Sequence, residues 1–392
     1  MAVTPPLHIV VVGSGLAGYG VLRELRRLAP DALLTLMTAD DGHFYSKPAL
    51  STALAKGKTA ATLVTTPAAK MAAQLRLDLR AGRIVEAIDP AGRVLLTTGG
   101  PLPYDKLVLA LGARPVRPAI EGDGANRALS VNNLDDYRVF RERLPDGARV
   151  LILGGGLVGS EFANDLAASG YRPTVVDLLR HPLAQLVPPP IGEVLRTALE
   201  AAGIRWHLGR RVVSIDQAGA ASRATLDDGT VIEADAVLSA VGLRPHTALA
   251  AEAGLTIGRG IKVDATGRTS DPHIYAIGDC AEYPRGLAAF VTPIMAAARA
   301  IAPSVLGTPT AIRFPTLSVQ VKTTSCPIVL LPAPAGLEGR WIKEADDADG
   351  LKYLFHDAAG ATRGYVLTGA RCAERPDMDR ALAEAAAGEE TT

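Results

Sequence analysis

Three glycines near the start of the chain, Gly13, Gly15 and Gly18, follow a run of apolar residues at the spacing Gly-x-Gly-x-x-Gly. In this spacing the first glycine permits a tight turn, the second lets the backbone approach a pyrophosphate, and the third lets the following helix pack close to the strand. Asp40 follows about twenty residues later, where a carboxylate can accept a hydrogen bond from a ribose hydroxyl. These residues predict a dinucleotide-binding site.

The same arrangement occurs a second time. Gly154, Gly156 and Gly159 follow another apolar run, and Asp177 is the acid that comes after them. Each copy is followed by an apolar strand that ends in Ala-x-Gly-x-Arg-Pro, at residues 110–115 and 240–245. Because strand, glycine turn, helix, acid and closing motif repeat in one order, the sequence predicts two Rossmann-like domains.

Three further side chains could take part in chemistry, and each has a plainer alternative. Lys47 ends an aromatic-rich loop that follows the first glycine turn, although most such lysines are solvated surface residues. Glu161 comes two residues after Gly159 and is expected in the first helical turn, where it could stabilise the helix dipole or bind a ligand. Asp279 ends a strand in Gly-Asp, which could hold a ribityl hydroxyl or simply cap a turn.

These residues need a buried sheet and covering helices to position them. Residues 8–12 and 33–37 are apolar runs typical of buried strands, and residues 16–28 have the apolar spacing of a helix that covers a sheet. After Arg244 we expect the chain to return to the first domain, because the strand that ends at Asp279 precedes a helix opened by Pro293. The positive end of that helix could face a ring that becomes anionic on reduction.

The C-terminal part lacks a glycine fingerprint. Its apolar segments predict strands at residues 317–322, 328–331, 351–356 and 364–367, and the chain from Met378 is expected to be helical. The predicted fold is therefore α/β, with two Rossmann-like dinucleotide-binding domains and a small C-terminal α+β domain. The expected boundaries are residues 1–114 and 244–312 for a discontinuous first domain, 115–243 for the second, and 313–392 for the third.

Composition excludes several classes of protein. A chain of 392 residues suits two or three domains, and the balance of 41 basic and 41 acidic residues argues against a nucleic-acid partner. Cys280, Cys326 and Cys372 are odd in number and far apart, so no dithiol relay is encoded. The histidines show no metal-binding grouping, and we expect no metal site.

The sequence also indicates a location. Residues 1–6 lack the charged and apolar regions of a signal peptide. The apolar stretch at residues 287–306 is interrupted by Pro293, Arg299 and Pro303, which disfavours a membrane span. We therefore expect a soluble, cytoplasmic protein.

Five longer motifs are more specific than the glycines. They are Ala39–Pro48 (Ala-Asp-Asp-Gly-His-Phe-Tyr-Ser-Lys-Pro), Glu161–Leu166 (Glu-Phe-Ala-Asn-Asp-Leu), Ile274–Glu282 (Ile-Tyr-Ala-Ile-Gly-Asp-Cys-Ala-Glu), Val321–Pro327 (Val-Lys-Thr-Thr-Ser-Cys-Pro) and Gly364–Gly369 (Gly-Tyr-Val-Leu-Thr-Gly). With them the chain resembles, over essentially its whole length, the pyridine nucleotide–disulphide reductases in their disulphide-free ferredoxin and rubredoxin reductase branch.

The resemblance implies that the first domain binds FAD and the second NAD. Asp40 would lie near the adenine ribose, and Val85 would contact the adenine through its backbone. Arg114 would lie near the pyrophosphate, Asp279 on the ribityl chain and Val291 at the pyrimidine edge of the flavin. The residues expected to bind FAD are Val11, Val12, Gly13, Ser14, Gly15, Ala17, Gly18, Ala39, Asp40, Lys47, Val85, Arg114, Glu161, Asp279, Val291 and Lys322.

The resemblance also implies roles at the flavin ring. Lys47 would lie beside flavin N5, and Lys322 would reach the flavin from the C-terminal domain. Glu161 would face the nicotinamide carboxamide, paired with Lys47, and these two are the expected catalytic residues. Asp177, on chemical grounds alone, should accept hydrogen bonds from both ribose hydroxyls and repel a 2′-phosphate, which favours NADH over NADPH. The residues expected to bind NADH are Gly154, Gly156, Leu157, Val158, Gly159, Glu161, Asp177 and Gly242.

The implied activity is reduction of a rubredoxin by NADH, with a hydride delivered to N5 of FAD and electrons released one at a time. Because the chain has no dithiol and no four-cysteine iron site, the rubredoxin would be a separate protein. Enzymatic alternatives are a ferredoxin or flavorubredoxin reductase and an NADH oxidase; a peroxidase would need a cysteine within residues 42–51, which contain none. A non-enzymatic alternative is an NAD(H)-gated interaction flavoprotein.

Overall fold

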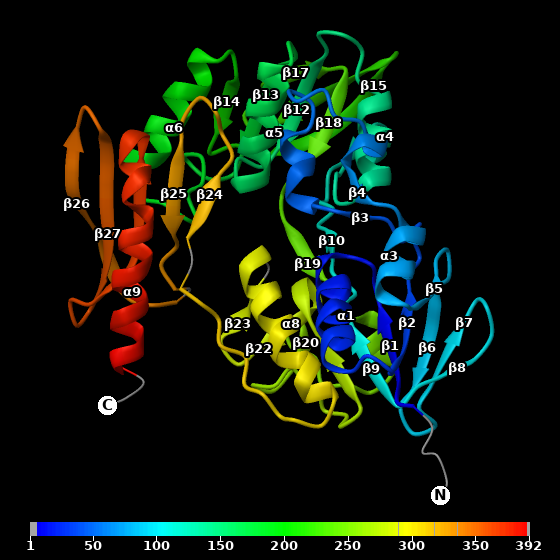
Figure 1. The fold of residues 1–392 in the computed structure, drawn as a ribbon. Coiled ribbons are helices and arrows are strands. Elements are labelled where there is room, and N and C mark those ends of the chain that lie inside the picture. Colours follow the sequence, from blue (N-terminus) through cyan, green and yellow to red (C-terminus); the bar gives the residue numbers. More distant parts are fainter. Residues whose placement is uncertain (1–5, 289, 317, 335, 390–392) are drawn as a thin grey trace, which may run out of the picture. The chain divides into compact units, whose positions relative to one another are not determined.

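The computed structural model of the protein describes residues 6–288, 290–316, 318–334 and 336–389, with labelled elements in Figure 1. The chain divides into two compact units. Unit 1 consists of the described residues within Met1–Lys47, Thr62–Arg114 and Leu243–Pro315. Unit 2 consists of the described residues within Pro48–Ala61, Pro115–Gly242 and Thr316–Thr392.

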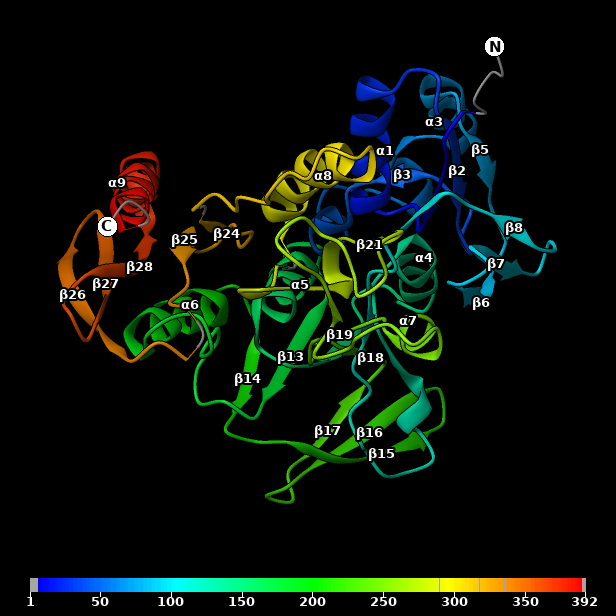
Figure 2. The same ribbon diagram turned by 90° about the horizontal axis from the view of Figure 1, so that it is seen from below.

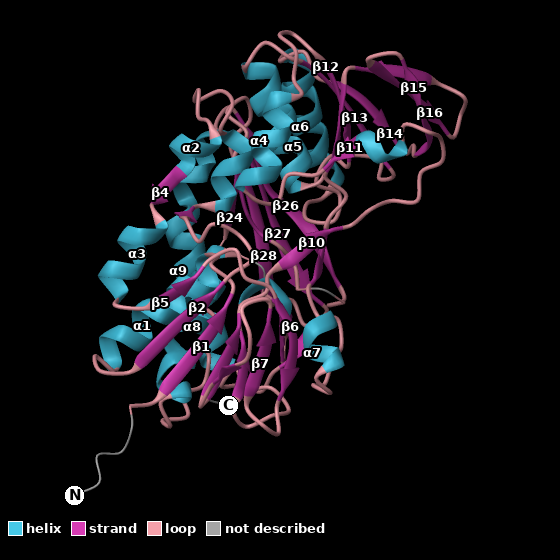
Figure 3. Ribbon diagram, turned by 90° about the vertical axis from the view of Figure 1, so that its right-hand side faces the viewer, coloured by secondary structure: helices cyan, strands magenta, loops and turns pink. Residues whose placement is uncertain are grey.

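Unit 1 is built on a sheet of five parallel strands. In spatial order they are β21 (Ile274–Ala276), β9 (Lys106–Leu109), β1 (His8–Val12), β2 (Leu33–Met37) and β5 (Asp78–Arg80). Ile9 and Val10 of β1 are fully buried, as expected for a parallel sheet covered on both faces. The helices α1 (Leu16–Leu28) and α8 (Val291–Val305) lie side by side, and α1 contributes Leu22 to the same core (Figures 1 and 3).

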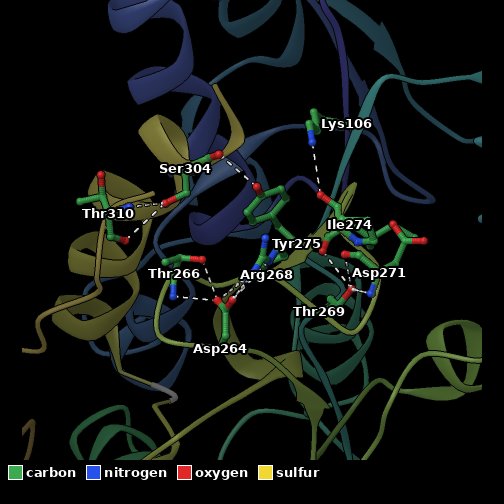
Figure 4. A network of polar contacts seen from close by, with 11 residues as sticks. Lys106, Asp264, Thr266, Arg268, Thr269, Asp271, Ile274, Tyr275, Ser304 and Thr310 are labelled. Carbon is green, nitrogen blue, oxygen red and sulfur yellow. Dashed lines mark hydrogen bonds and ion pairs between the residues drawn. The ribbon is translucent and has the colours of Figure 1, made fainter. Parts of the chain in front are cut away.

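The strand β21 joins this sheet although it comes late in the sequence, with Ile274 paired to Leu107 of β9. A polar network holds the returning segment in place (Figure 4). The hydroxyl of Tyr275 donates to the carbonyl of Ser304 at 3.0 Å, and the Ser304 hydroxyl accepts from the N–H of Thr310 at 2.9 Å. The network therefore links β21 to the end of α8 and fixes the strand that leads to Asp279.

The remaining elements of unit 1 are short. Two antiparallel groups are β6 (Val85–Asp89), β7 (Val94–Thr97) and β8 (Leu102–Pro103), and β3 (Phe44–Tyr45) with β4 (Val64–Thr66). The others are β20 (Ile261–Lys262), β22 (Ala281–Tyr283), β23 (Gly286–Leu287), β19 (Leu243–Pro245), α3 (Ala68–Leu75), α7 (Ala248–Glu252) and the 3₁₀ turn η3 (Gly278–Cys280). Where the chain passes between the units lie η1 (Lys47–Thr52), α2 (Ala60–Leu63) and β10 (Ala113–Pro115).

Unit 2 contains a second sheet of five parallel strands, part of which is seen in Figure 2. In spatial order the strands are β11 (Ala128–Leu129), β18 (Ala236–Ser239), β12 (Arg149–Leu153), β13 (Arg172–Asp177) and β14 (Arg205–Leu208). Its other elements are α4 (Leu134–Glu142), α5 (Leu157–Ala168), α6 (Pro189–Ala201), η2 (Ala125–Arg127) and the antiparallel strands β15 (Val212–Ala218), β16 (Ala221–Leu226) and β17 (Val231–Ala234). The two parallel sheets confirm the predicted pair of Rossmann-like domains.

The C-terminal part of unit 2 is an antiparallel sheet with one long helix, α9 (Arg375–Glu389). In spatial order its strands are β24 (Val319–Val321), β25 (Ile328–Leu331), β28 (Thr362–Thr368), β27 (Gly350–Asp357) and β26 (Gly339–Asp347), and η4 (Gly369–Glu374) precedes α9. This confirms the predicted α+β composition. The edge strand β26 was not expected, and Leu317, where one predicted strand begins, lies outside the described residues. The boundaries of the three expected domains stay a prediction.

Within the described residues, no helix has both the length and the apolarity required to cross a bilayer. The apolar helix α8 is 15 residues long and contains Pro303.

The strand–turn–helix of unit 1 predicts opposite effects for two glycines of α1. A methyl group on Gly18 would lie 1.9 Å from the carbonyl oxygen of Gly13, so Gly18→Ala should lower the free energy of unfolding by about 3 kcal/mol or more. A methyl group on Gly20 would make ordinary contact with Ala298 at 3.5 Å, and Gly20→Ala should stabilise the helix by up to about 1 kcal/mol. Urea unfolding of both variants tests the pair; equal midpoints would contradict the close packing at Gly18.

Candidate functional site

The first glycine turn leaves the N-terminus of α1 open. The N–H of Gly13 donates to the carbonyl of Met37 at 2.8 Å, which closes the turn onto β2. Gly15 is the N-cap of α1; it supplies no side-chain acceptor, and the first turn of the helix contains no acid. A methyl group on Gly15 would meet nothing within 4 Å. A helix start without a side-chain cap, with open space beside Gly15, fits a pyrophosphate.

The second glycine turn repeats this geometry in unit 2. The N–H of Gly154 donates to the carbonyl of Val176 at 2.8 Å, and Gly156 is the N-cap of α5 without a side-chain acceptor. A methyl group on Gly156 would also meet nothing within 4 Å, whereas one on Gly159 would lie 1.9 Å from the carbonyl oxygen of Gly154. The second turn therefore fits a second pyrophosphate.

The acids of the two sites are held differently. Asp40 is surrounded by donors from the protein: its carboxylate accepts from the Ser14 hydroxyl at 2.7 Å, from the Thr38 hydroxyl at 2.6 Å and from the N–H of Gly42 at 2.9 Å. A further ligand would therefore compete for few remaining lone pairs on Asp40.

Among the described residues, the donors that hold Asp177 all belong to the backbone. Its carboxylate accepts from the N–H of Gly155 and from the N–H of Leu179, the latter at 2.7 Å. Each carboxylate oxygen thus keeps a lone pair that a ribose hydroxyl could use.

A cavity of about 370 Å³ opens at the carboxyl ends of β2 and β5 in unit 1. Its lining residues are Met37, Leu79, Arg80, Ala81, Arg83, Thr97 and Gly99. Ligands of open parallel sheets bind beyond the carboxyl ends of the strands, so the cavity lies on the side of the sheet suited to the nucleotide.

Aromatic packing positions the loop that carries Lys47. Phe44 makes an edge-to-face contact with Tyr19 of α1, at 5.7 Å between ring centroids, and the Arg23 guanidinium lies 4.4 Å from the Phe44 centroid. The Tyr19 hydroxyl also donates to the carbonyl of Gly42. At the end of this loop the Lys47 ammonium lies 3.6 Å from a carboxylate oxygen of Asp279. The structure thus brings together two of the expected site residues within unit 1.

Asp279 lies close to the first glycine site. It follows β21 in η3, and a methyl group on its neighbour Gly278 would lie 2.8 Å from Cβ of Ala17 at the start of α1. Gly278 has φ of +80°, a conformation that glycine adopts without strain. Close approach and turn geometry together place a half-buried carboxylate beside the N-terminus of α1.

Glu161 lies deeper in α5 than expected. The helix begins at Leu157, so the prediction that Glu161 occupies the first turn is wrong, and this carboxylate does not cap the helix. It is 1% exposed and accepts from the Ser51 hydroxyl at 2.6 Å and from the backbone N–H of Lys322 at 3.1 Å. The Lys322 ammonium lies 2.8 Å from the same carboxylate, so the buried charge is paired.

The structure therefore gives the two expected catalytic residues separate ionic partners within their own units. The pairing of Lys47 with Glu161, and the approach of Lys322 to a flavin, stay predictions.

Two polar residues of α5 were missed by the sequence analysis. The buried carboxylate of Asp165 accepts from the N–H groups of Leu54 and Ala55 at 2.8 and 3.1 Å, and burial raises the pKa of this carboxyl. The Asn164 side chain donates to the Thr324 hydroxyl at 3.1 Å and accepts from the Ser325 hydroxyl at 3.0 Å. A signal was available, because residues three and four positions after Glu161 share its helical face.

The other expected residues occupy varied positions. Val11 and Val12 are buried in β1, and Gly18 is buried in α1. Val85 in β6 and Leu157 at the start of α5 are half-buried. The exposed ones are Ala39, Arg114, Val158, Gly242 and Val291.

Sequence analysis also missed His246, whose N–H donates to the carbonyl of Gly112 at 3.0 Å. Burial, followed by the charges of Arg114 and Lys47, lowers the pKa of His246. Nothing in the sequence around His246 indicated this position.

The three cysteines and the possible metal ligands were located among the described residues. Cys280, Cys326 and Cys372 are free thiols, and complete burial raises the pKa of Cys280 to about 11. A thiol with that pKa is a poor nucleophile at neutral pH. In the described part of the chain, no group of three histidine, cysteine or acidic side chains is placed to hold a metal ion.

Comparison with known proteins adds independent findings. Residues 7–302 match a family model described as pyridine nucleotide-disulphide oxidoreductase, and residues 311–382 match one described as rubredoxin binding C-terminal domain. The chain is similar to the rubredoxin-NAD(+) reductase of Alcanivorax borkumensis, with 41% identity over 375 residues that cover 95% of this chain and 98% of that protein.

Two further proteins that are similar to this chain carry other names. The nitric oxide reductase FlRd-NAD(+) reductase of Aeromonas hydrophila is 38% identical over 363 residues, which cover 92% of this chain and 93% of that protein. Among solved structures, a ferredoxin reductase from Rhodopseudomonas palustris has a TM-score of 0.84 at 29% identity, covering 92% of this chain and 91% of that chain.

Proposed function

The chain belongs to the pyridine nucleotide-disulphide oxidoreductase family, and from this premise we propose that it is an NADH-dependent flavoprotein that reduces a separate rubredoxin. The observation that carries the proposal is the combination of two open helix N-termini, at Gly15 and Gly156, with a C-terminal domain that matches the rubredoxin-binding model. Family membership implies FAD and NAD(P)H as cofactors. FAD and NAD(P)H each contain one pyrophosphate, so the two cofactors require two pyrophosphate sites.

Three of the site residues have proposed roles at the flavin and the nicotinamide. The Asp279 carboxylate, beside the N-terminus of α1, would accept from a ribityl hydroxyl. The Lys47 ammonium, held near Asp279, would place positive charge beside flavin N5. The buried carboxylate of Glu161, oriented by Ser51 and Lys322, would hold the nicotinamide carboxamide. When bound, FAD supplies the chemistry, because it can take a hydride from NADH and release electrons singly.

The proposed organisation follows the same reasoning. Residues 1–114 and 244–312 would form the FAD-binding domain, residues 115–243 the NAD-binding domain and residues 313–392 the rubredoxin-binding domain. Three free cysteines and a need for NADH suit a reducing compartment, and we place the protein in the cytoplasm.

A flavorubredoxin reductase is the second candidate, because relatives such as that of Aeromonas hydrophila carry the name nitric oxide reductase FlRd-NAD(+) reductase. Both candidates transfer electrons to a small iron protein and differ only in its identity. A peroxidase of the same fold is disfavoured, since residues 42–51 contain no cysteine and Cys280 is a buried thiol of raised pKa.

The acceptor can be identified by coupled turnover. Purified holoprotein with NADH should reduce cytochrome c rapidly only when a rubredoxin is added, and the rate with rubredoxin should exceed the rate of oxygen consumption by at least about tenfold. Parallel assays with a ferredoxin and with the rubredoxin domain of a flavorubredoxin rank the alternatives. An NADH turnover rate that rubredoxin does not change would refute the proposal.

Asp177 should select NADH over NADPH. A carboxylate that binds two ribose hydroxyls repels a 2′-phosphate, at an upper limit of about 4 kcal/mol for unit charges roughly 4 Å apart in an effective dielectric near 20. The variant Asp177→Ser should therefore lower kcat/KM for NADH and raise it for NADPH. Asp135→Ser, at an exposed acid of α4, is the matched control and should change neither value. A wild-type kcat/KM for NADPH equal to that for NADH would show that this role of Asp177 is wrong.

Lys47 should matter for the rate of flavin reduction more than for FAD retention. Removing a positive charge from the place where negative charge develops should slow stopped-flow reduction by NADH by about tenfold or more in Lys47→Ala. The FAD content should stay near one per chain. Lys70→Ala changes an exposed lysine of α3 in the same unit and serves as the control. An unchanged reduction rate in Lys47→Ala would make Lys47 an ordinary surface lysine.

A further inference from the structure

The two glycine sites can be aligned through one shared hydrogen bond, from Gly13 to Met37 in unit 1 and from Gly154 to Val176 in unit 2. In this alignment Asp177 corresponds to Thr38 rather than to Asp40. The middle residue of the turn also differs, because Ser14 in the first site corresponds to Gly155 in the second. The duplicated turns therefore use different means to hold their acids.

In the second site an aromatic ring lies beside the glycine that replaces the serine of the first site. Gly155 corresponds to Ser14, and a methyl group on Gly155 would lie 3.1 Å from Cζ3 of Trp206 and 3.2 Å from a carboxylate oxygen of Asp177. Ser14 holds Asp40 by a hydrogen bond from its hydroxyl. Gly155 instead offers its backbone N–H to Asp177, with the indole ring packed behind it.

The sheet register explains how Trp206 reaches this turn. β14 lies beside β13, where Trp206 pairs with Val175 and Leu208 pairs with Asp177. Side chains two positions apart on a strand share a face, so Trp206 and Asp177 project from the same side of the sheet. By the same alignment Trp206 corresponds to Leu79 of β5, which lines the cavity of unit 1.

The polar atom of Trp206 has no hydrogen-bond partner among the described residues. Its Nε1 is buried and has no hydrogen-bond acceptor in the described structure, which carries a free-energy cost. A phenylalanine would fill apolar space without that cost. What the indole adds is the longer reach of a fused two-ring system, and Cζ3 at its far end is the ring atom that would meet a methyl group on Gly155.

The backbone around Asp177 is fixed from the other side as well. The carbonyl of Asp177 accepts from the N–H of Arg210 at 2.9 Å, and the carbonyl of Leu179 accepts from the N–H of Gly209 at 2.9 Å. The carboxylate of Asp177 is therefore held by the N–H groups of Gly155 and Leu179, while its own backbone is tied to Arg210.

We propose that Trp206 is a positioning residue for the adenosine end of the nicotinamide coenzyme: its ring holds the Gly155 peptide so that the Gly155 N–H orients Asp177 toward the ribose hydroxyls. The inference rests on the proposed binding of NADH in unit 2. It adds a residue that acts through Gly155 and Asp177 and does not take part in hydride transfer.

The chain contains only two tryptophans, which permits a direct optical test with NAD⁺ as the probe. In Trp341→Phe holoprotein the remaining emission comes from Trp206, and it should change saturably as NAD⁺ is added. In Trp206→Phe the remaining emission comes from Trp341, which packs on Phe355 in the C-terminal sheet and should not respond. A Trp206 emission that stays constant at saturating NAD⁺ would overturn the proposal.

Kinetics separate positioning from general structural damage. Trp206→Phe should raise KM for NADH by about threefold to tenfold while kcat changes by less than about twofold, because the altered contact lies far from the nicotinamide. Trp341→Phe is the matched control and should change neither constant. A parallel fall in kcat and FAD content without a change in KM would indicate a purely structural role.

A double variant tests the contact itself. Gly155→Ala should raise KM for NADH, because the added methyl group presses on Trp206 and Asp177. A smaller ring leaves room for that methyl group, so Gly155→Ala combined with Trp206→Phe should raise KM by less than the product of the separate fold-changes. Multiplicative effects would refute the contact. If wild-type flavin is not reduced by NADH at all, the proposed function fails, whatever Trp206 does.

Discussion

In the proposed function both parallel sheets depend on α1 and α5, two helices whose glycine N-caps make no side-chain hydrogen bond in the described structure. Glycine at the N-cap, at residues 15 and 156, forgoes only about a few tenths of a kcal/mol relative to a serine or aspartate cap. In return the positive ends of α1 and α5 stay open to phosphate oxygens. The tight approach of Gly18 to the Gly13 carbonyl, and of Gly159 to the Gly154 carbonyl, then sets where each helix begins.

Local sequence patterns predicted much of this fold. β2 and α1 have the bounds that the apolar runs and glycine spacing predicted, because a buried parallel strand and a covering helix leave strong periodic signals. The edge strand β26 left none, because its Gly-Arg-Trp-Ile-Lys-Glu-Ala-Asp-Asp sequence is largely exposed and half charged. Edge strands carry such charges to prevent pairing with other chains, and the same charges hide them from a search for apolar alternation.

The hydrogen-bond and ionic partners of the site residues were harder to predict from the sequence. The spacing that follows Gly159 predicted Glu161 in the first helical turn, as a capping or a ligand-binding acid. The structure places Glu161 beyond that turn and buries its carboxylate against Ser51 and Lys322, which lie far away in the sequence. Asn164 and Asp165 extend the same buried polar face and bind the same two segments of unit 2, at Thr324 and at Leu54. A sequence shows that three polar residues share a helical face, but their partners depend on tertiary packing. Burying such groups is tolerable only because each one is hydrogen-bonded or paired.

The late arrival of β21 has a consequence for the order in which the protein is made. β9 leaves the ribosome early, and its outer edge stays unpaired until residue 274 has been synthesised. By then all five strands of the parallel sheet of unit 2, residues 128–239, have already emerged. Domains of a nascent chain usually complete themselves from the N-terminus onward. Here the sheet that starts second is the first whose strands are all present, so during translation the glycine turn at Gly154 can reach its final surroundings before the one at Gly13.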